Sequence, residues 1–307
     1  MVNQFLQSHN IPNSSIDAIA SHGQTIYHAP KRLHQLPHFG NGTLQIGDAD
    51  HIATTTGIIT LSDFRQKHIA RGGEGAPLAV YGDYLLFSHQ TENRIMLNIG
   101  GIANFTFLPS HNQGGNIICT DTGAGNTLMD AFTQTHFPPN TYDADAALAK
   151  QGAVNPSLLN TLLQHPFFHQ SFPKSTGQET FNLSFLNQAL DQANLPNLSP
   201  YDTLATLNFF TAHTITQAIN TAIPSTNSLT IYVSGGGIHN PLLMQNLHAL
   251  LPQAVFNPIH QLGIPPDAKE AILFAILANE TLAAQSFSHY QEVGLLSVSL
   301  GKVSFPS

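Results

Sequence analysis

The stretch Ile117-Ile-Cys-Thr-Asp121 carries the clearest chemical signal in the sequence, a carboxylate delivered at the end of a short apolar run. A glycine turn, residues 122–125, follows at once, and Asn126 can serve as the N-cap of a helix that begins there. An ionised carboxylate can act as a general base or hold Mg²⁺ through water. Open α/β sheets bind ligands at the carboxyl ends of their strands. Asp121 is therefore a candidate catalytic residue, although a turn aspartate is the ordinary explanation of one such residue.

Two further strands are followed by glycine clusters, Asn98-Ile-Gly-Gly-Ile-Ala-Asn104 and Ser234-Gly-Gly-Gly237. Successive backbone N–H groups in such turns form a concave anion site, so both are candidate phosphate or nucleotide contacts. Either turn alone is more simply explained as a tight turn. No Walker A lysine and no G-x-G-x-x-G pattern accompanies them, which weakens the P-loop and Rossmann interpretations.

Other charged residues have structural explanations beside functional ones. Asp63 and Arg65 could form a local ion pair, and Glu270 could pair with Lys269 or Lys174. Glu270 precedes an apolar helix face, where an unpaired carboxylate would be costly.

A loop rich in histidine and proline, residues 28–42, contains His28, His34 and His38. We reject a metal site there, because Pro30 and Pro37 exclude a regular helix and no cysteine or carboxylate joins the group.

The composition narrows the class of protein. Hydrophobic residues make up 42% of the 307 residues, which excludes disorder and allows two domains or one large α/β domain. Charged residues make up 9% and the net charge is −8, which argues against nucleic-acid binding. The single cysteine, Cys119, fits a reducing cytosol and is expected to be a small buried core residue. We see no signal peptide or membrane-spanning run, and expect a soluble cytoplasmic protein.

The elements that must position these residues alternate between strands and helices. In the first part this rhythm predicts a mostly parallel sheet. Gly100-Gly101 between two paired strands predicts a hairpin turn with positive φ at both residues. We expect a very apolar helix after Asp267 to be buried, with the space between the two lobes as its expected place. The expected strands are 16–20, 43–46, 58–61, 94–99, 102–108, 117–121, 229–233 and a weak one within 294–305, and the expected helices are 1–9, 48–56, 78–87, 126–132, 143–152, 156–164, 182–193, 199–223, 241–251 and 265–277.

Eight motifs, taken in order, resemble the anhydro-N-acetylmuramic acid kinase family. They are Ser21-His-Gly-Gln-Thr25, Leu44-Gln-Ile-Gly-Asp48, Asp63-Phe-Arg65, Gly72-Gly-Glu-Gly-Ala-Pro77, Asn98 to Asn104, Asp121-Thr-Gly-Ala-Gly-Asn126, Ser234 to Gly237 and Asp267 to Ala278. Each motif is weak by itself, whereas eight in family order across nearly the whole chain are specific.

The resemblance implies a fold, a reaction and a set of site residues. The fold is the two-lobed α/β fold of sugar kinases, actin and heat-shock chaperone ATPases, with mixed sheets and helices on both faces. The reaction opens the 1,6-anhydro ring of anhydro-N-acetylmuramic acid with water while ATP, accompanied by Mg²⁺, phosphorylates O6, in bacterial peptidoglycan recycling. Asp121 would be the base that activates the water, and no metal ligand is assigned directly. The sugar side would include His22, Gln24, Arg65 and Glu270, and the nucleotide side Asn98, Gly100, Gly101, Gly123, Gly235, Gly236 and Gly237.

The chain also departs from the family pattern. Family members begin with a glycine-rich Met-Ser-Gly-Thr-Ser-Xaa-Asp-Gly hairpin that grips the phosphates, and this chain starts after it, so we expect a truncated first lobe. His68 stands where an acidic residue is expected and could weaken sugar or ion binding, while Ala124 replaces a usual proline. We expect lobe one at residues 1–92, joined by 285–307, and lobe two at 93–284.

Two alternatives remain open at the level of the sequence. One is a non-catalytic remnant that keeps sugar binding but lacks a complete phosphate site, and the other is a different kinase of the same superfold. The expected partners are an amino sugar and ATP, with neither nucleic acid nor a membrane, and a homodimer is an open expectation.

Overall fold

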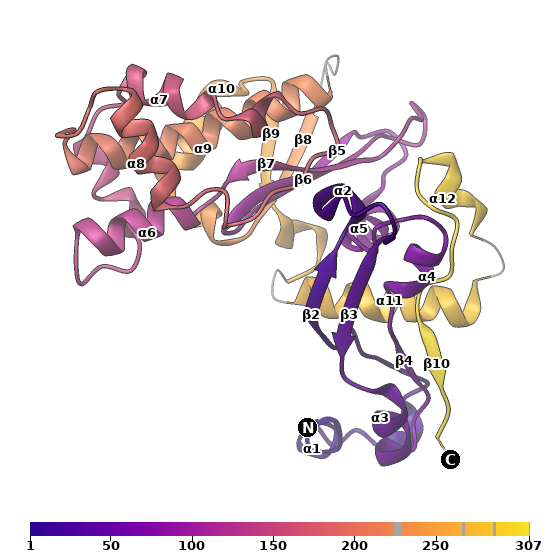
Figure 1. Cartoon of the computed structure of the whole chain (residues 1–307). Helices are drawn as coiled ribbons and strands as arrows, with labels where there is room; N and C mark the ends of the chain where they lie inside the picture. Colours follow the sequence, from indigo (N-terminus) through magenta and orange to yellow (C-terminus); the bar gives the residue numbers. More distant parts are fainter. Residues whose placement is uncertain (224–228, 266–267, 285–286, 307) are drawn as a thin grey trace. The chain divides into compact units, whose positions relative to one another are not determined.

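The computed structural model describes residues 1–223, 229–265, 268–284 and 287–306, and the chain divides into two compact units (Figure 1). The first unit comprises Met1–Phe87 with Asp267–Ser307, and the second comprises Ser88–Pro266. The first boundary lies a few residues before the expected 92/93. The segment from 267 to 284, which we expected in lobe two, belongs to the first unit because its helix packs on elements of that unit. The expected α/β class, with mixed sheets and helices, is confirmed.

The strands of the first unit form two small sheets. β4 (Thr60–Ser62) pairs parallel with β1 (Ile19–Ala20) and antiparallel with β10 (Lys302–Ser304). β2 (Gln24–Ala29) and β3 (Gly42–Ile46) form a separate antiparallel hairpin. The prediction of a mostly parallel sheet is therefore wrong, because β3 returns along β2 and the closing strand joins β4 in the opposite direction. The predicted strand at 16–20 is shortened to two residues, and part of the expected loop at 28–42 is strand and helix.

The first unit also contains seven α-helices within the described residues. They are α1 (Val2–Ser8), α2 (Lys31–His34), α3 (Ala49–Thr56), α4 (Gln66–Ala70), α5 (Ala79–Phe87), α11 (Lys269–Ala283) and α12 (Ser288–Glu292). Of these, α3 and α11 pack on the strands of the unit. The N-cap of α3 is Asp48, whose carboxylate accepts the N–H of Asp50 at 2.8 Å.

The apolar helix α11 buries one face rather than most of its surface. Leu273, Phe274 and Leu277 are buried, whereas Ala271 and Ala275 are exposed. α11 approaches α5 closely at Gly82, where a methyl group would come within 2.4 Å of Leu273 Cδ1. Residues 266 and 267, which the sequence places at the start of this helix, lie outside the described residues.

The second unit is built on a five-stranded sheet in the order β7-β6-β5-β8-β9. β5 (Arg94–Ile99), β6 (Ile102–Leu108) and β7 (Ile118–Ala124) are antiparallel, and β8 (Leu229–Ser234) and β9 (Ala254–Pro258) continue parallel to β5. The predicted β5–β6 hairpin is confirmed. Its turn is not the predicted one, because Ile99 pairs with Ala103, which leaves three residues between them, and neither Gly100 nor Gly101 has positive φ.

Helices cover this sheet and form a second core beside it. They are α6 (Thr127–His136), α7 (Pro156–Leu163), α8 (Leu183–Gln192), α9 (Pro200–Ala222) and α10 (Pro241–Leu250). The helix expected at 143–152 is instead two short 3₁₀ turns, Ala144–Ala146 and Ala149–Gln151.

The long helix α9 joins the two cores. Leu204, Leu207 and Phe210 in its first half pack with α6, α7 and α8, and Ile215 and Ile219 in its second half pack on the sheet. Its buried threonines are tolerated since several hydroxyls, such as that of Thr206 on the carbonyl of Asp202 (2.7 Å), bond one turn back.

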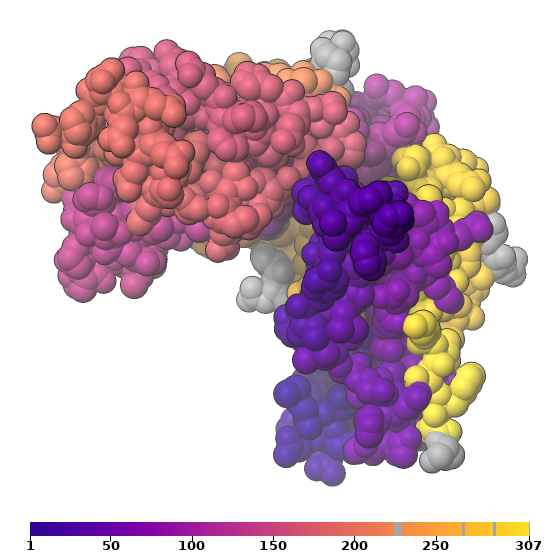
Figure 2. All heavy atoms as spheres, in the orientation of Figure 1, coloured from indigo at the N-terminus to yellow at the C-terminus, as the bar shows by residue number. Residues whose placement is uncertain are grey.

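The β2–β3 hairpin and the residues between its strands expose several large apolar side chains; this part of the chain is drawn in indigo in Figure 2. Tyr27, Leu33 and Phe39 are all more than half exposed there. Across the part of the chain that the structure describes, no helix has both the length and the apolar character to cross a membrane.

Candidate functional site

A row of polar side chains crosses the sheet of the second unit near the strand ends. Asn98 on β5 lies opposite Asn104 on β6 and opposite Ser234 on β8, and Asn104 lies opposite Asp121 on β7. Directly paired residues on neighbouring strands share a face of the sheet. The alternating residues, such as Leu97 and Phe105, point into the core on the other face. The sheet therefore presents one carboxylate and three neutral polar groups in a line.

A β-bulge places Asp121 in this row. Gly123 pairs with Ala103, but Asn104 pairs with Asp121, so Thr122 is an extra residue on β7. If the ladder continued regularly from the Gly123–Ala103 pair, Asp121 would lie opposite Phe105, which faces the core. The bulge thus keeps the carboxylate on the polar face.

The three glycine turns converge at the tip of the β5–β6 hairpin. Gly125 N donates to Gly101 O (2.9 Å), and Asn126 N donates to Gly100 O (2.8 Å). From the other side Gly235, at φ +83°, lies so close that a methyl group there would sit 2.6 Å from Ile99 O. The structure therefore brings the residues assigned to the nucleotide side together at one end of one sheet.

Asn126 lies at the N-cap position of α6, but its side chain makes no capping hydrogen bond. Its amide Nδ2 instead donates to Ile99 O (3.1 Å), so it fastens the start of α6 to the hairpin tip. The first-turn N–H groups of α6 consequently have no side-chain acceptor from Asn126, in a place where a helix N-terminus favours an anion.

A segment after the 3₁₀ turn Pro166–His169 holds Asp121 from the edge of the sheet. Asp121 N donates to Lys174 O (3.0 Å), and Thr176 N donates to the Asp121 carboxylate oxygen Oδ2 (2.8 Å). A charge-assisted bond of this kind fixes the orientation of the carboxylate.

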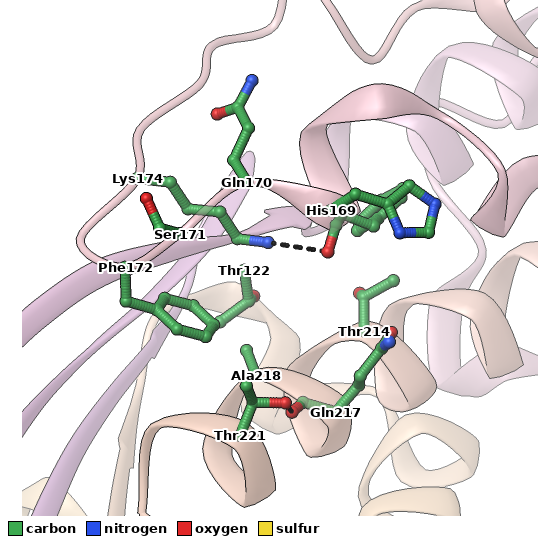
Figure 3. A pocket seen from close by; sticks show the side chains of 11 residues that line it. Thr122, His169, Gln170, Ser171, Phe172, Lys174, Thr214, Gln217, Ala218 and Thr221 are labelled. Atoms are coloured by element: carbon green, nitrogen blue, oxygen red, sulfur yellow. Dashed lines mark hydrogen bonds between the residues drawn. The ribbon is translucent and has the colours of Figure 1, made fainter.

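Lys174 anchors this segment from within a cavity of about 340 Å³ (Figure 3). Its side chain is 8% exposed, and its ammonium donates to the carbonyls of Phe167 (3.0 Å) and Phe168 (3.5 Å). The aromatic rings of Phe167 and Phe172 lie 4.5 and 5.0 Å from the nitrogen. Burial lowers the pKa of Lys174. Lys174, for which one sequence interpretation suggested Glu270 as a partner, makes these contacts within the second unit and supports the residue that orients Asp121.

The first unit gathers His22 and Arg65. Arg65 Nε donates to His22 Nε2 (3.0 Å), and Arg65 Nη1 donates to Gly75 O (2.7 Å). His22 Nδ1 contacts Gly23 O (2.9 Å), so the proton of the imidazole resides on Nδ1, and the ring packs on Phe274 with centroids 4.6 Å apart. Burial, and secondly the charge of Arg65, lowers the pKa of His22. Two of the five guanidinium donors of Arg65 are used in these bonds.

Glu270 and Gln24 lie at the margin of this group. Glu270 is exposed in the first turn of α11, and its charge opposes the lowering of the Arg65 pKa, which burial causes. Its neighbour Lys269 pairs with Asp83 at 2.8 Å, and Asp63 pairs with Lys302, so neither local ion pair suggested by the sequence forms. Gln24 is exposed at the start of β2, where its amide donates to Thr25 O (3.3 Å).

Three residues of the site were not assigned an individual role from the sequence. Ser234 and Asn104 lie inside motifs but join the polar row only through strand register. Thr176 contributes a backbone N–H, which any residue type would supply. The described residues contain no group of three or more histidine, cysteine or acidic side chains able to hold a metal ion.

Known proteins resemble this chain along nearly its whole length. The family model described as anhydro-N-acetylmuramic acid kinase matches residues 1–303. A protein of that name from Pseudoalteromonas atlantica is 55% identical over 309 residues, which cover 100% of this chain and 77% of the relative. One from Pseudoalteromonas translucida is 54% identical over 307 residues, 99% of this chain and 77% of the relative. Among solved structures, the activator of the 2-hydroxyisocaproyl-CoA dehydratase from Clostridium difficile, with bound ADPNP, aligns at a TM-score of 0.32 and 16% identity, covering 78% of this chain and 72% of that one.

A substitution at Gly235 tests the close approach of the glycine turns at the tip of the β5–β6 hairpin. We expect Gly235→Ala to lower the free energy of unfolding by about 1–3 kcal/mol, because the residue has φ +83° and the methyl group would strike Ile99 O. Urea unfolding followed by circular dichroism measures the change. Gly40→Ala is the matched control, since a methyl group at Gly40 meets nothing within 4 Å. Equal unfolding midpoints for the two variants would contradict the close approach.

Protonation of partly buried histidines is expected to lower the free energy of unfolding at acidic pH. Burial lowers the pKa of His22, His68, His165 and His213 below 6.5 in the folded protein. As the pH falls through 6.5, the unfolded chain takes up protons that the folded chain does not, so the free energy of unfolding decreases. We expect the urea midpoint to drop between pH 7.5 and 5.5. A midpoint that is constant or rises over this range would show that these histidines are not held neutral.

Proposed function

The chain belongs to the anhydro-N-acetylmuramic acid kinase family, and we propose that it catalyses the coupled ring opening and phosphorylation of anhydro-N-acetylmuramic acid. Water adds to the anomeric carbon, the bond from that carbon to O6 breaks, and O6 takes the γ-phosphoryl group of ATP. The products are ADP and N-acetylmuramic acid 6-phosphate. The reaction would serve peptidoglycan recycling in the cytoplasm.

The observation that carries this proposal is the position of Asp121 beside the converging glycine turns. The carboxylate is oriented by Thr176 N–H and stands in a row with Asn104, Asn98 and Ser234. We assign Asp121 the role of general base that takes the proton of the attacking water. The anhydro oxygen is a poor nucleophile until its ring bond breaks, so water addition supplies the negative charge that attacks phosphorus.

The nucleotide side of the proposal rests on the hairpin tip. Gly100, Gly101 and the turn 235–237 meet there, and the N-terminus of α6 adds a favourable site for an anion. Phosphoryl transfer depends mainly on positioning and charge neutralisation, which backbone N–H groups can provide. We assign ATP to this region, with Asn98 and Gly123 as further contacts.

We propose Mg²⁺ only as the ion that accompanies the phosphates of ATP. The described side chains form no cage of metal ligands, and Mg²⁺ at phosphate sites commonly keeps several waters with one or two protein ligands at most. When bound it would neutralise phosphate charge, and we derive no step through it.

The sugar side of the proposal rests on the first unit. Arg65 has guanidinium donors beyond those bonded to His22 and Gly75, and a planar guanidinium is suited to a carboxylate such as that of muramic acid. His22, Gln24 and Glu270 are assigned with it to sugar binding.

Replacing the base tests the proposal. Asp121→Asn keeps the size and the acceptor for Thr176 N–H but cannot take a proton. We expect the formation of ADP and the 6-phosphate to fall by about 10²–10⁴-fold, measured by ³¹P NMR, with unchanged circular dichroism. An Asn variant as active as the parent would show that Asp121 is not the base.

Calorimetric titration of the parent protein with the sugar and with ATP distinguishes the proposed kinase from the non-catalytic remnant. The remnant would bind the sugar but not ATP.

A further inference from the structure

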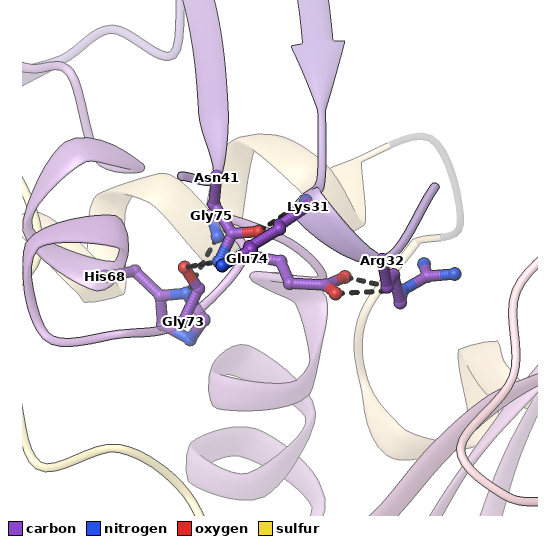
Figure 4. Close-up of polar contacts among 7 residues, drawn as sticks. All are labelled: Lys31, Arg32, Asn41, His68, Gly73, Glu74 and Gly75. Atoms are coloured by element: carbon purple, nitrogen blue, oxygen red, sulfur yellow. Dashed lines mark hydrogen bonds and ion pairs between the residues drawn. The ribbon is translucent and has the colours of Figure 1, made fainter. Parts of the chain in front are cut away.

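The backbone of Gly75 is hydrogen-bonded at both of the peptide groups that flank its Cα. Arg65 Nη1 donates to its carbonyl (2.7 Å), and its own N–H donates to His68 Nδ1 (2.9 Å). Figure 4 shows His68 beside the turn formed by Gly73, Glu74 and Gly75. A methyl group on Gly73 would come within 2.3 Å of His68 Nδ1, so the imidazole is seated directly on the turn.

These bonds extend into a chain of four groups. His22 Nε2 accepts from Arg65, Arg65 donates to Gly75, and Gly75 donates to His68. The bond from Gly75 requires a lone pair on His68 Nδ1, because a protonated imidazole has two donors and no acceptor. His68 must therefore be neutral, with its proton on Nε2.

The surroundings of His68 favour the neutral form. The ring of Tyr81 meets it edge-on with centroids 6.0 Å apart. The charged groups that act on it are Glu74, which raises its pKa, and Arg65, which lowers it, and burial is the largest cause of the lowered pKa.

The glycine turn has a second attachment that does not involve His68. Glu74 pairs with Arg32 at 2.9 Å, and Asn41 Nδ2 donates to Gly73 O (2.9 Å) (Figure 4). Asn41 also accepts the N–H of Lys31 (2.7 Å). The turn is thus tied to the end of the β2–β3 hairpin, so loss of the His68 bond should let the backbone of Gly75 rotate without unfolding the unit.

We propose that His68 is a positioning residue for Arg65. His68 acts through the backbone of Gly75 and requires a proton-free Nδ1. His68 fixes the Glu74–Gly75 peptide and so limits the rotations at Gly75 that would turn its carbonyl away from Arg65. This carbonyl in turn orients the guanidinium toward an anionic sugar. The inference rests on the proposed sugar-binding role of Arg65. It also replaces the expectation that His68, by lacking an acidic group, only weakens binding.

Two substitutions distinguish the effect of the hydrogen-bond acceptor at His68 from the effect of the bulk of its ring. His68→Asn places an amide oxygen where Nδ1 lies and does not titrate, whereas His68→Leu keeps the bulk and removes the acceptor. We expect His68→Leu to weaken binding of anhydro-N-acetylmuramic acid about threefold to tenfold at pH 7.5 in calorimetry, which is the range for one lost hydrogen bond. His68→Asn should recover most of that loss. His51→Leu, at an exposed histidine on α3, is the matched control.

The pH profile supplies the readout that a purely structural role would not move. We expect the amide resonance of Gly75 in the full chain, without ligand, to shift as the pH falls below 6.5 in the parent and to stay constant in His68→Asn. Sugar affinity should fall with it, less steeply in His68→Asn, where His22 and His28, the other histidines on which the charge of Arg65 acts, still titrate. Equal affinities and pH profiles in the parent, Asn and Leu proteins would overturn the proposal. A Gly75 resonance that titrates in a protein without sugar affinity would instead remove the proposed function and leave the His68–Gly75 bond intact.

Discussion

The arrangement of the glycine turns in the second unit depends on the carbonyl groups of three residues, Ile99, Gly100 and Gly101. Buried backbone carbonyls need donors, and these three receive them from Gly125, Asn126 and Thr127 at the start of α6. Gly235 approaches Ile99 from β8 too closely for any side chain. Three segments distant in the sequence are thereby fixed against one another. Their glycines are required by contact distances as much as by any ligand.

This constraint also places the catalytic candidate. The end of β7 must pair with the hairpin tip through Ala124 and Gly123, and only the bulge at Thr122 lets Asp121 stay on the polar face. Thr176 and Lys174 then hold the carboxylate from the sheet edge. Lys174 is buried without a carboxylate partner among the described residues, a costly arrangement that its two carbonyl contacts and the phenylalanine rings offset.

In the first unit, Arg65 is likewise held by a small number of polar contacts. Its guanidinium is hydrogen-bonded to a histidine nitrogen and a backbone carbonyl, two neutral partners that leave its charge uncompensated by a direct hydrogen bond, while Glu270 acts on it only through its charge. Both histidines in the chain of contacts have to stay neutral for this to hold.

Local patterns in the sequence predicted much of the fold. The helices expected at 48–56 and 199–223 and the strands leading into glycine turns follow from spacing and residue type. Strand partners did not follow, because β3 and β10 are placed by contacts far along the chain, and the prediction of a mostly parallel first sheet was wrong for that reason. The bulge at Thr122 and the Thr176 donor are backbone features without a side-chain signature. His68 was recognisable as unusual, but its partner Gly75 emerges only in three dimensions.

The central claim is that water addition to the sugar and phosphorylation of O6 are one coupled reaction on this chain. The reaction run in H₂¹⁸O with ATP and anhydro-N-acetylmuramic acid, followed at early times by mass spectrometry, tests it directly. We predict one ¹⁸O on the anomeric carbon of the product and none in its phosphoryl group. Release of ¹⁸O-labelled inorganic phosphate with the anhydro sugar unchanged would contradict the account, because ATP would then be hydrolysed without ring opening.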